Sequence, residues 1–287
     1  MSEILGSISK RFSASSASSR KILIIGVFLV SFVISLNAFA NLFGYDPLAI
    51  TTDVLLQPSL KHLMGTDQLG RDVFIRVCYG AKSSLTVAFI AVVISLSIGT
   101  TIGAFSGFFA GKTDRILSIV FDALYAFPGI ILAILIAVIL GPGIFTTSVA
   151  ISVGEIPQYF RVVRGLSLSL RERPYMEAEI ALGARPRNLI FQHILPYAVP
   201  SIVTIMTLSM GSAILQVSGL GFLGLGLPPP TPEWGLDLGR GRDFITMGVW
   251  WASTFPGLMI LVSVIGFTLI GEALSEILGT KKSVKMA

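Results

Sequence analysis

Two glycine-containing segments have nearly the spacing of loops that bind nucleotide phosphates. Residues 106–113 read Ser-Gly-Phe-Phe-Ala-Gly-Lys-Thr and match the P-loop pattern except at Ser106, which stands where the first glycine belongs. Residues 219–224 read Gly-Leu-Gly-Phe-Leu-Gly, which is the spacing of a dinucleotide-binding loop. Such loops hold phosphates only where they connect a strand to a helix, and both segments lie in apolar stretches without that pattern. We therefore expect this chain to bind no nucleotide.

Side chains that commonly perform catalysis or bind metal ions are few and scattered. Cys78 is the only cysteine, which excludes an intramolecular disulfide and a metal site built from cysteines. His62 and His193 lie far apart in the sequence, and neither a His-Glu-x-x-His nor a Gly-x-Ser-x-Gly motif is present. The sequence predicts a protein that is not an enzyme, with no metal site and no cofactor of its own.

The most concentrated polar segment is residues 161–196, an island of charge between two long apolar regions. Its centre, residues 171–187, reads Arg-Glu-Arg-Pro-Tyr-Met-Glu-Ala-Glu-Ile-Ala-Leu-Gly-Ala-Arg-Pro-Arg. An otherwise apolar chain does not need such an island for solubility alone. We interpret it as a docking surface on one face of a membrane protein.

The centre of this island has the features of a short amphipathic helix, predicted at residues 175–182. Pro174 is suited to the first helical position, and acidic residues follow in the first turns, where the helix dipole favours them. Gly183 can end or bend the helix. A small apolar face at helical spacing is formed by Ala178, Ala181 and Leu182. Such a helix fits a groove on a partner protein; the alternative is a helix that lies on lipid headgroups.

The composition places the whole chain in the membrane. It is 53% hydrophobic and only 13% charged, whereas soluble domains carry about 25% charged residues. Lysine, arginine, aspartate and glutamate are absent from residues 22–45, 83–111, 123–154, 188–232 and 244–271. About 20 apolar residues cross the hydrocarbon core as a helix. Since Gly141-Pro142-Gly143 divides the third interval, we predict six spans, at residues 22–43, 83–111, 115–140, 144–163, 194–217 and 244–271.

The distribution of basic residues predicts the orientation. With the N-terminus in the cytoplasm, most of the 21 lysines and arginines, including those of the island, fall on cytoplasmic segments. The net charge is +5 without a single basic patch, so no nucleic-acid partner is expected. The alternative for the first span is a secretory signal cleaved near Ala38-Phe39-Ala40.

These expectations divide the chain into consecutive segments. They are a cytoplasmic tail (1–21), a first transmembrane helix (22–43), an outer segment (44–80), a five-helix core (81–278) with an inner loop at 164–193 and an outer loop at 217–249, and a second cytoplasmic tail (279–287).

Glycines and isolated acids mark particular positions within the predicted spans. Gly99, Gly103 and Gly107 recur every fourth residue, so they line one helix face against which a neighbouring helix can pack closely. Gly111 continues the series or belongs to the following turn. Ionisable residues at Asp122, Glu155 and Glu272 lie in or near apolar helices. Each is expected either to pair with another residue or to contact a substrate or ion.

The island also carries a family resemblance. Glu177-Ala178 with Gly183, followed by Leu195-Pro196, resembles the EAA loop of ATP-binding cassette (ABC) importer permeases. The chain departs from that pattern at Glu179, where alanine is usual, and at His193, where isoleucine is usual. Further segments resemble the oligopeptide, dipeptide and nickel branch of the family, at residues 64–73, 79–81, 222–235 and 255–257.

The resemblance implies an all-α integral membrane protein with the type I ABC importer permease fold, six transmembrane helices, cytoplasmic termini and a cytoplasmic coupling helix. It implies a multi-pass subunit of the cell membrane that forms a path for peptides with a homologous permease subunit. Two ABC ATPase subunits would drive it, and an extracytoplasmic substrate-binding protein would deliver the cargo. Nickel, metallophore or oligosaccharide uptake by the same machinery is the alternative. A stand-alone secondary transporter or channel is the alternative from a different class, and a membrane enzyme is a weaker one.

The resemblance also assigns residues to roles. The coupling residues are Glu177, Ala178, Ala181, Leu182, Gly183, Arg185 and Arg187. The outer loop would form an outer gate or dock the binding protein through Gly221, Gly224, Gly226, Pro228, Pro229 and Trp234. The alternative for this loop is a rigid surface segment.

Overall fold

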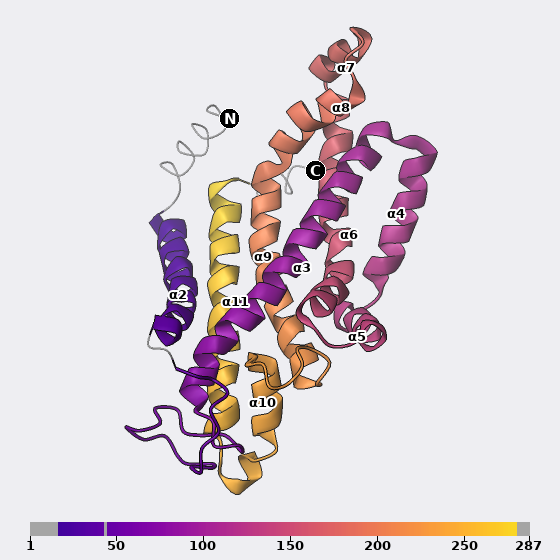
Figure 1. The fold of residues 1–287 in the computed structure, drawn as a ribbon. Helices are drawn as coiled ribbons and strands as arrows, with labels where there is room; N and C mark the ends of the chain where they lie inside the picture. The colour runs from indigo at the N-terminus through magenta and orange to yellow at the C-terminus, as the bar shows by residue number, and fades with distance from the viewer. Residues whose placement is uncertain (1–16, 43–44, 280–287) are drawn as a thin grey trace.

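The computed structural model describes residues 17–42 and 45–279, and in this part of the chain every regular element is helical (Figure 1). The elements are α2 (Ala17–Leu42), α3 (Val73–Phe109), α4 (Gly111–Ala126), α5 (Gly129–Leu140), α6 (Ile144–Arg171), α7 (Pro174–Ala181), α8 (Pro186–Leu189), η1 (Ile190–Ile194), α9 (Leu195–Phe222), α10 (Trp234–Arg242), η2 (Ile245–Met247) and α11 (Trp251–Ile277). Most of the two predicted tails lies outside the described residues.

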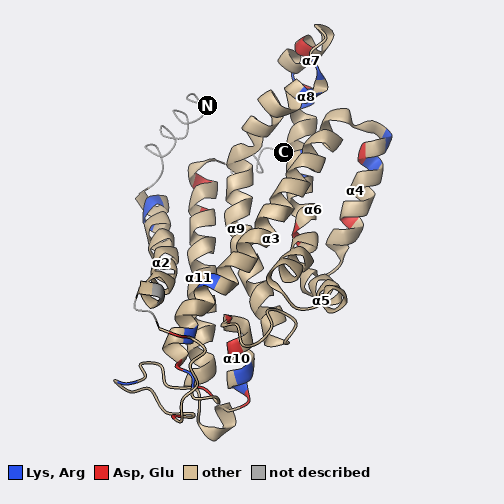
Figure 2. Ribbon diagram, in the orientation of Figure 1, with Lys and Arg blue, Asp and Glu red and all other residues tan. Residues whose placement is uncertain are grey.

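The long helices form a bundle with two different ends (Figure 1). The largest contact is between α3 and α6, while α11 packs on α2, α9 and α10. One end, which we call the α7 end, carries α7, α8, the start of α2 and the end of α11. The opposite α10 end carries α10 and the segment before α3. Figure 2 shows that charged residues gather toward these two ends, as expected of a chain whose middle lies in lipid.

The helices α2, α3, α9 with its short N-terminal extension, and α11 are each long and apolar enough to cross a membrane. The pair α4 and α5 is long and apolar enough to count as a fifth span when its two helices are taken together, although the chain bends between them. The remaining predicted span, at residues 144–163, corresponds to α6, which is less apolar because it carries Glu155, Arg161 and Arg164. Its 28 residues nevertheless pack along α3.

The prediction of one continuous helix at residues 115–140 is wrong. The chain bends by 92° between α4 and α5. Phe127 has an extended backbone (φ −81°, ψ 137°) and is followed by Pro128. A proline disfavours helical geometry at the residue before it and has no N–H to donate. Counting charge-free residues overlooked this break.

Other predicted boundaries were also displaced. Helix α3 begins at Val73, within the predicted outer segment, because the Asp72 side chain accepts a hydrogen bond from the Ile75 N–H at 3.1 Å and caps the helix. Helix α9 extends to Phe222, past the predicted end of its span at 217, and α11 begins only at Trp251, after the predicted start at 244. At the N-terminus α2 already begins at Ala17, and the residues of the alternative cleavage site lie inside it.

Candidate functional site

Helix α7 forms where its sequence predicts it. Pro174 occupies the first position, and Glu177 lies in the first turn. Gly183 ends the helix with φ +83°, a left-handed conformation that glycine adopts without strain. Its N–H donates to the Ile180 carbonyl oxygen at 3.0 Å, and the Ala184 N–H donates to the Glu179 carbonyl oxygen at 3.0 Å. These bonds satisfy carbonyl groups at the helix C-terminus.

One side chain anchors α7 to the bundle. Met176 is fully buried and packs in an apolar cluster with Leu170 of α6, Leu189 of α8 and Ile194 of η1. It is the one residue of α7 that the bundle buries. The residues predicted to contact an ATPase lie outside this cluster and are exposed, namely Glu177, Ala178, Ala181, Leu182, Gly183, Arg185 and Arg187. Sequence analysis missed Met176, although it precedes Glu177 directly.

The two residues that depart from the family pattern contact each other. His193 Nε2 lies 3.2 Å from Glu179 Oε2, and the rings of Tyr175 and His193 have centroids 6.2 Å apart. The pair therefore connects α7 to η1, on the other side of the loop. Both side chains are about one-third exposed, so water screens the pair and its contribution to stability is small.

Next to α7 lies a groove with a volume of about 460 Å³. Its walls include Glu177 and Ala181 of α7 and Leu168 and Arg171 at the end of α6. The groove thus joins the exposed face of α7 to the helix that packs most extensively in the bundle.

Ion pairs and close helix contacts join α6 to the neighbouring helices. Arg164 of α6 binds Asp114 of α4 with two hydrogen bonds of 2.5 and 2.6 Å, and Ser106 of α3 donates to the same carboxylate at 2.7 Å. Arg161 of α6 also pairs with Asp122 of α4 at 2.8 Å, although both side chains are more than half exposed.

The glycine stripe of α3 lies directly against the α6 backbone. A methyl group at Gly103 would be 2.6 Å from the Phe160 carbonyl oxygen, and one at Gly107 would be 2.5 Å from the Arg164 carbonyl oxygen. Gly99 lies equally close to Tyr159 and Ile156. In contrast, Gly111 has φ +72° and open space around it, so it lies at the start of α4 and is not part of the stripe. The stripe lets α3 and α6 approach to backbone contact.

At the α10 end, two buried residues fix the outer loop. The Trp234 side chain is fully buried, and its Nε1–H donates to the Val77 carbonyl oxygen at 2.9 Å. Glu233 is also fully buried and accepts hydrogen bonds from Ser84 Oγ (3.0 Å) and from the N–H groups of Gly235 and Leu236 (2.8 Å each). Burial raises the pKa of Glu233 to about 7.

These contacts correct part of the prediction for the outer loop. The structure buries the Trp234 side chain and the Cα atoms of Gly221 and Gly226 within the chain. These three residues therefore cannot form a docking surface. Gly221 is needed for a different reason, because a methyl group there would lie 2.0 Å from Glu233 Oε2. The residues that remain exposed are Gly224, Pro228 and Pro229.

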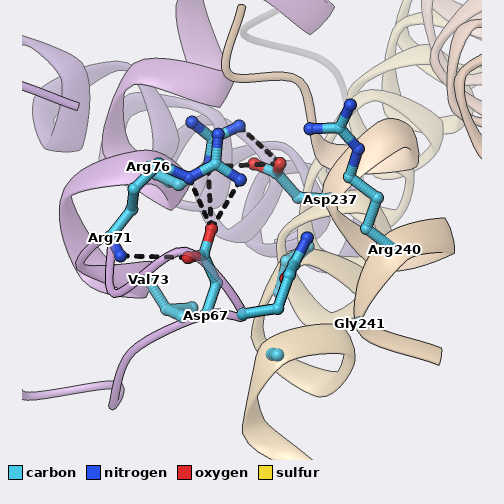
Figure 3. Close-up of a pocket in the computed structure, with 10 residues that line it drawn as sticks. Asp67, Arg71, Val73, Arg76, Asp237, Arg240 and Gly241 are labelled. Atoms are coloured by element: carbon cyan, nitrogen blue, oxygen red, sulfur yellow. Dashed lines mark hydrogen bonds and ion pairs between the residues drawn. The ribbon is translucent and has the colours of Figure 1, made fainter. Parts of the chain in front are cut away.

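A buried ion-pair cluster joins the outer segment to α3 and α10 (Figure 3). Asp67 binds Arg71 at 2.6 Å, and Arg76 of α3 binds Asp237 of α10 at 2.5 Å. Arg240 points toward the same cluster, where burial and the nearby Arg71 charge lower its pKa. Arg76 and Asp237 are 161 residues apart in the chain, so the sequence offered no signal for the pair that joins α3 to α10.

Comparison with known proteins identifies the family. A model described as "Binding-protein-dependent transport system inner membrane component" matches residues 99–284. The chain belongs to this family. The dipeptide transport system permease protein DppC of Alkalihalophilus pseudofirmus is 41% identical to this permease, over 91% of the chain and 86% of that protein. The glutathione transport system permease protein GsiD of Pectobacterium atrosepticum is 39% identical, over 84% and 78%, respectively. The probable D,D-dipeptide transport system permease protein DdpC of Escherichia coli is 37% identical, over 85% and 82%.

The fold of the permease agrees with a solved transporter. A chain from an inward-facing structure of the MetNI methionine ABC transporter aligns with a TM-score of 0.53 and 24% identity, covering 69% of this chain and 96% of that one. The permease is thus a multi-pass membrane subunit of an ABC importer, and its family implies ATPase and substrate-binding partners. This assignment replaces the alternatives of a stand-alone secondary transporter, a channel or a membrane enzyme.

Proposed function

We propose that this permease and a second, homologous permease together form a path through which peptides enter the cell. Support comes from the relatives, which are named for the transport of dipeptides, D,D-dipeptides and glutathione. These cargoes share a peptide or peptide-like backbone. The complete importer would also contain two ATPases bound at the α7 end and a substrate-binding protein docked at the α10 end.

The observation that carries the coupling role is the exposed but anchored helix α7. Its outer face is free to enter a groove on an ATPase, while Met176 fixes its inner face to the ends of α6 and η1. A displacement of α7 is therefore transmitted to α6. Because α6 contacts the α3 backbone at the glycine stripe and binds α4 through Arg164, the displacement moves several helices together.

On the opposite side, we assign docking of the binding protein to the exposed part of the outer loop around Gly224, Pro228 and Pro229. Glu233 and Trp234 hold this surface in place from below. A fixed surface is favourable for docking, since little ordering entropy is lost on association.

The coupling role is tested with Glu177→Lys and Gly183→Pro in the importer reconstituted with its ATPases and binding protein. The first reverses a charge beside the groove, and the second cannot adopt the φ of +83° that ends α7. We expect ATP hydrolysis to continue while peptide uptake per ATP falls about tenfold or more. The matched control is Asp243→Lys, the same type of charge reversal at an exposed position at the other end. Normal uptake by both coupling variants would refute the assignment of α7.

The cargo is tested separately with the wild-type importer. Radiolabelled dipeptides and longer peptides should accumulate in proteoliposomes in an ATP-dependent manner, with excess unlabelled peptide as the competitor. Uptake of nickel or oligosaccharides without any uptake of peptides would overturn the peptide proposal and leave the coupling role intact.

A further inference from the structure

A polar site lies inside the bundle, away from both charged ends. It consists of Glu155 on α6 with Ser212 and Gln216 on α9, and we call it the Glu155 site. Ser212 Oγ and Gln216 Nε2 each donate to Glu155 Oε1 at 2.7 Å. Glu155 lies eleven residues into α6, or about 16 Å from its start at 1.5 Å per residue, which is near the middle of a hydrocarbon core about 30 Å thick.

The site lies beside the elbow between α4 and α5. A methyl group at Gly154 would be 3.4 Å from the Cα of Gly129, the first residue of α5. One at Gly129 would in turn be 3.6 Å from Gln216 Oε1. Ser212 and Gln216 are partly exposed, and so is Gly129. Glu155 itself is only 8% exposed, so the opening of the site lies at its partly exposed neighbours on α5 and α9.

This open side does not suit contact with lipid. An ionisable group at the middle of the membrane is costly unless it faces protein or a cavity that contains water. Two polar neighbours on α9 continue the same polar surface, which would be equally unfavourable against lipid tails. We conclude that this surface faces the passage between the two permeases.

The site has more hydrogen-bond acceptors than donors. Both donors bind Oε1, so Glu155 Oε2 accepts no hydrogen bond from the residues that the structure describes. Gln216 Oε1 is buried and also accepts none. Among the described residues, no lysine, arginine or histidine forms an ion pair with Glu155.

The missing partner is therefore a cation that donates hydrogen bonds. A divalent metal ion fits poorly, because no three metal-binding side chains gather in the described part of the chain. A carboxylate would be repelled by Glu155. A primary ammonium group supplies one positive charge opposite that of Glu155 and an N–H donor for its second oxygen, Oε2.

We propose that Glu155 binds the N-terminal ammonium group of the peptide as it moves through the passage, with Ser212 and Gln216 orienting the carboxylate. This inference rests on the proposed function, because it requires a peptide cargo. Glu155 thereby becomes a residue that determines specificity within the permease, in addition to any selection by the binding protein.

The test uses Glu155→Gln in the complete reconstituted importer. The variant retains an acceptor oxygen for Ser212 and Gln216 but loses the charge, so the helix contacts are preserved. We expect kcat for peptide uptake to fall about tenfold, the effect of losing one hydrogen bond to a charged group. KM for the loaded binding protein should not change, because that protein docks at the α10 end, away from the Glu155 site. Asp243→Asn, which removes an exposed carboxylate outside the transport path, is the matched control and should transport normally.

A second measurement separates cargo binding from a structural role. Peptides with a photoreactive N-terminal residue are trapped in the importer during ATP turnover, irradiated and mapped by mass spectrometry. Labels should fall on α6 near Glu155 and on α9 near Ser212, and Glu155→Gln should reduce them about tenfold. Labels confined to other helices, or unchanged uptake by Glu155→Gln, would overturn the proposal.

Two further outcomes have distinct meanings. If Glu155→Gln separates from the second permease on gel filtration while Asp243→Asn remains assembled, Glu155 pairs with that subunit and the proposal is overturned. If the wild-type importer takes up no peptide at all, the proposed function fails. The uptake assay on wild type alone gives this result, so it is independent of any variant.

Discussion

The contact between α3 and α6 gives the sharpest quantitative prediction, and Gly103→Ala is the change that tests it. The added methyl group would lie 2.6 Å from the Phe160 carbonyl oxygen and 3.1 Å from the Phe160 Cα. Ordinary van der Waals contact begins at 3.4 Å. Both obstructing atoms are backbone atoms, so no side-chain rotation relieves the clash and the two helices must separate.

A matched control exists on the partner helix. Gly165 of α6 has nothing within 4 Å of an added methyl group and does not adopt a positive φ. Replacing it with alanine should therefore gain up to about 1 kcal/mol of helix propensity at no steric cost. Gly103→Ala gains the same helix propensity, but overpacking costs about 1–3 kcal/mol of stability. We expect a cost of about 3 kcal/mol, because the clash is with backbone atoms. After the gain in propensity, the net loss of stability should be about 2 kcal/mol.

The single cysteine provides the assay. Cys78 is fully buried, so a maleimide that becomes fluorescent on reaction with thiols reports unfolding of the purified chain in detergent. At about 2 °C per kcal/mol for a chain of this size, Gly103→Ala should lower Tm by about 4 °C, and Gly165→Ala should raise it by about 2 °C. If Gly103→Ala melts at or above the temperature of Gly165→Ala, the described contact between α3 and α6 is wrong.

Two more predictions concern the opposite ends of the molecule. Burial raises the pKa of Glu233 from 4.5 to about 7, so the folded chain holds the proton more tightly than the unfolded chain does. The resulting stability, about 3 kcal/mol, is complete below pH 4.5 and is lost as the pH rises through 7. Thermal melts followed by near-ultraviolet circular dichroism should show a lower Tm at pH 8 than at pH 5 in wild type and not in Glu233→Gln. An equal fall in Tm in both proteins would contradict the raised pKa of Glu233. Met176→Ala should cost about 2–5 kcal/mol and raise hydrogen exchange in α7 by about 30-fold or more. Leu182→Ala, at an 87% exposed position, should leave that exchange unchanged; similar exchange in both variants would show that Met176 is not the anchor.

Several features could be predicted from local sequence because their causes are local. Charge-free intervals of sufficient length located the membrane-crossing regions, and Pro174 and Gly183 bounded α7 through their own backbone preferences. The regular spacing of Gly99, Gly103 and Gly107 indicated one helix face, although not which helix it would contact. The bend at Phe127–Pro128 also had a local signal, which was overlooked because only charged residues were counted.

Other features depended on residues that are distant in the chain. Arg76 falls in the predicted outer segment, but the structure places it inside α3, where it pairs with Asp237 of α10. Trp234 resembled an exposed residue of the outer loop, yet it fills space above Gly80 and Val77. Glu179 and His193 were two separate departures from a pattern until the fold placed them 3.2 Å apart.

The sequence by itself determined that this protein lies in a membrane, approximately where it crosses, and where the short helix α7 forms between two crossings. These properties follow from composition, from proline and glycine geometry, and from spacing along a single helix. Only the tertiary structure decided which polar groups are satisfied, which aromatic side chains are buried, and that Glu155 meets Ser212 and Gln216 with acceptor atoms left over. Burial and charge pairing depend on neighbours brought together from separate helices, and no local pattern records them.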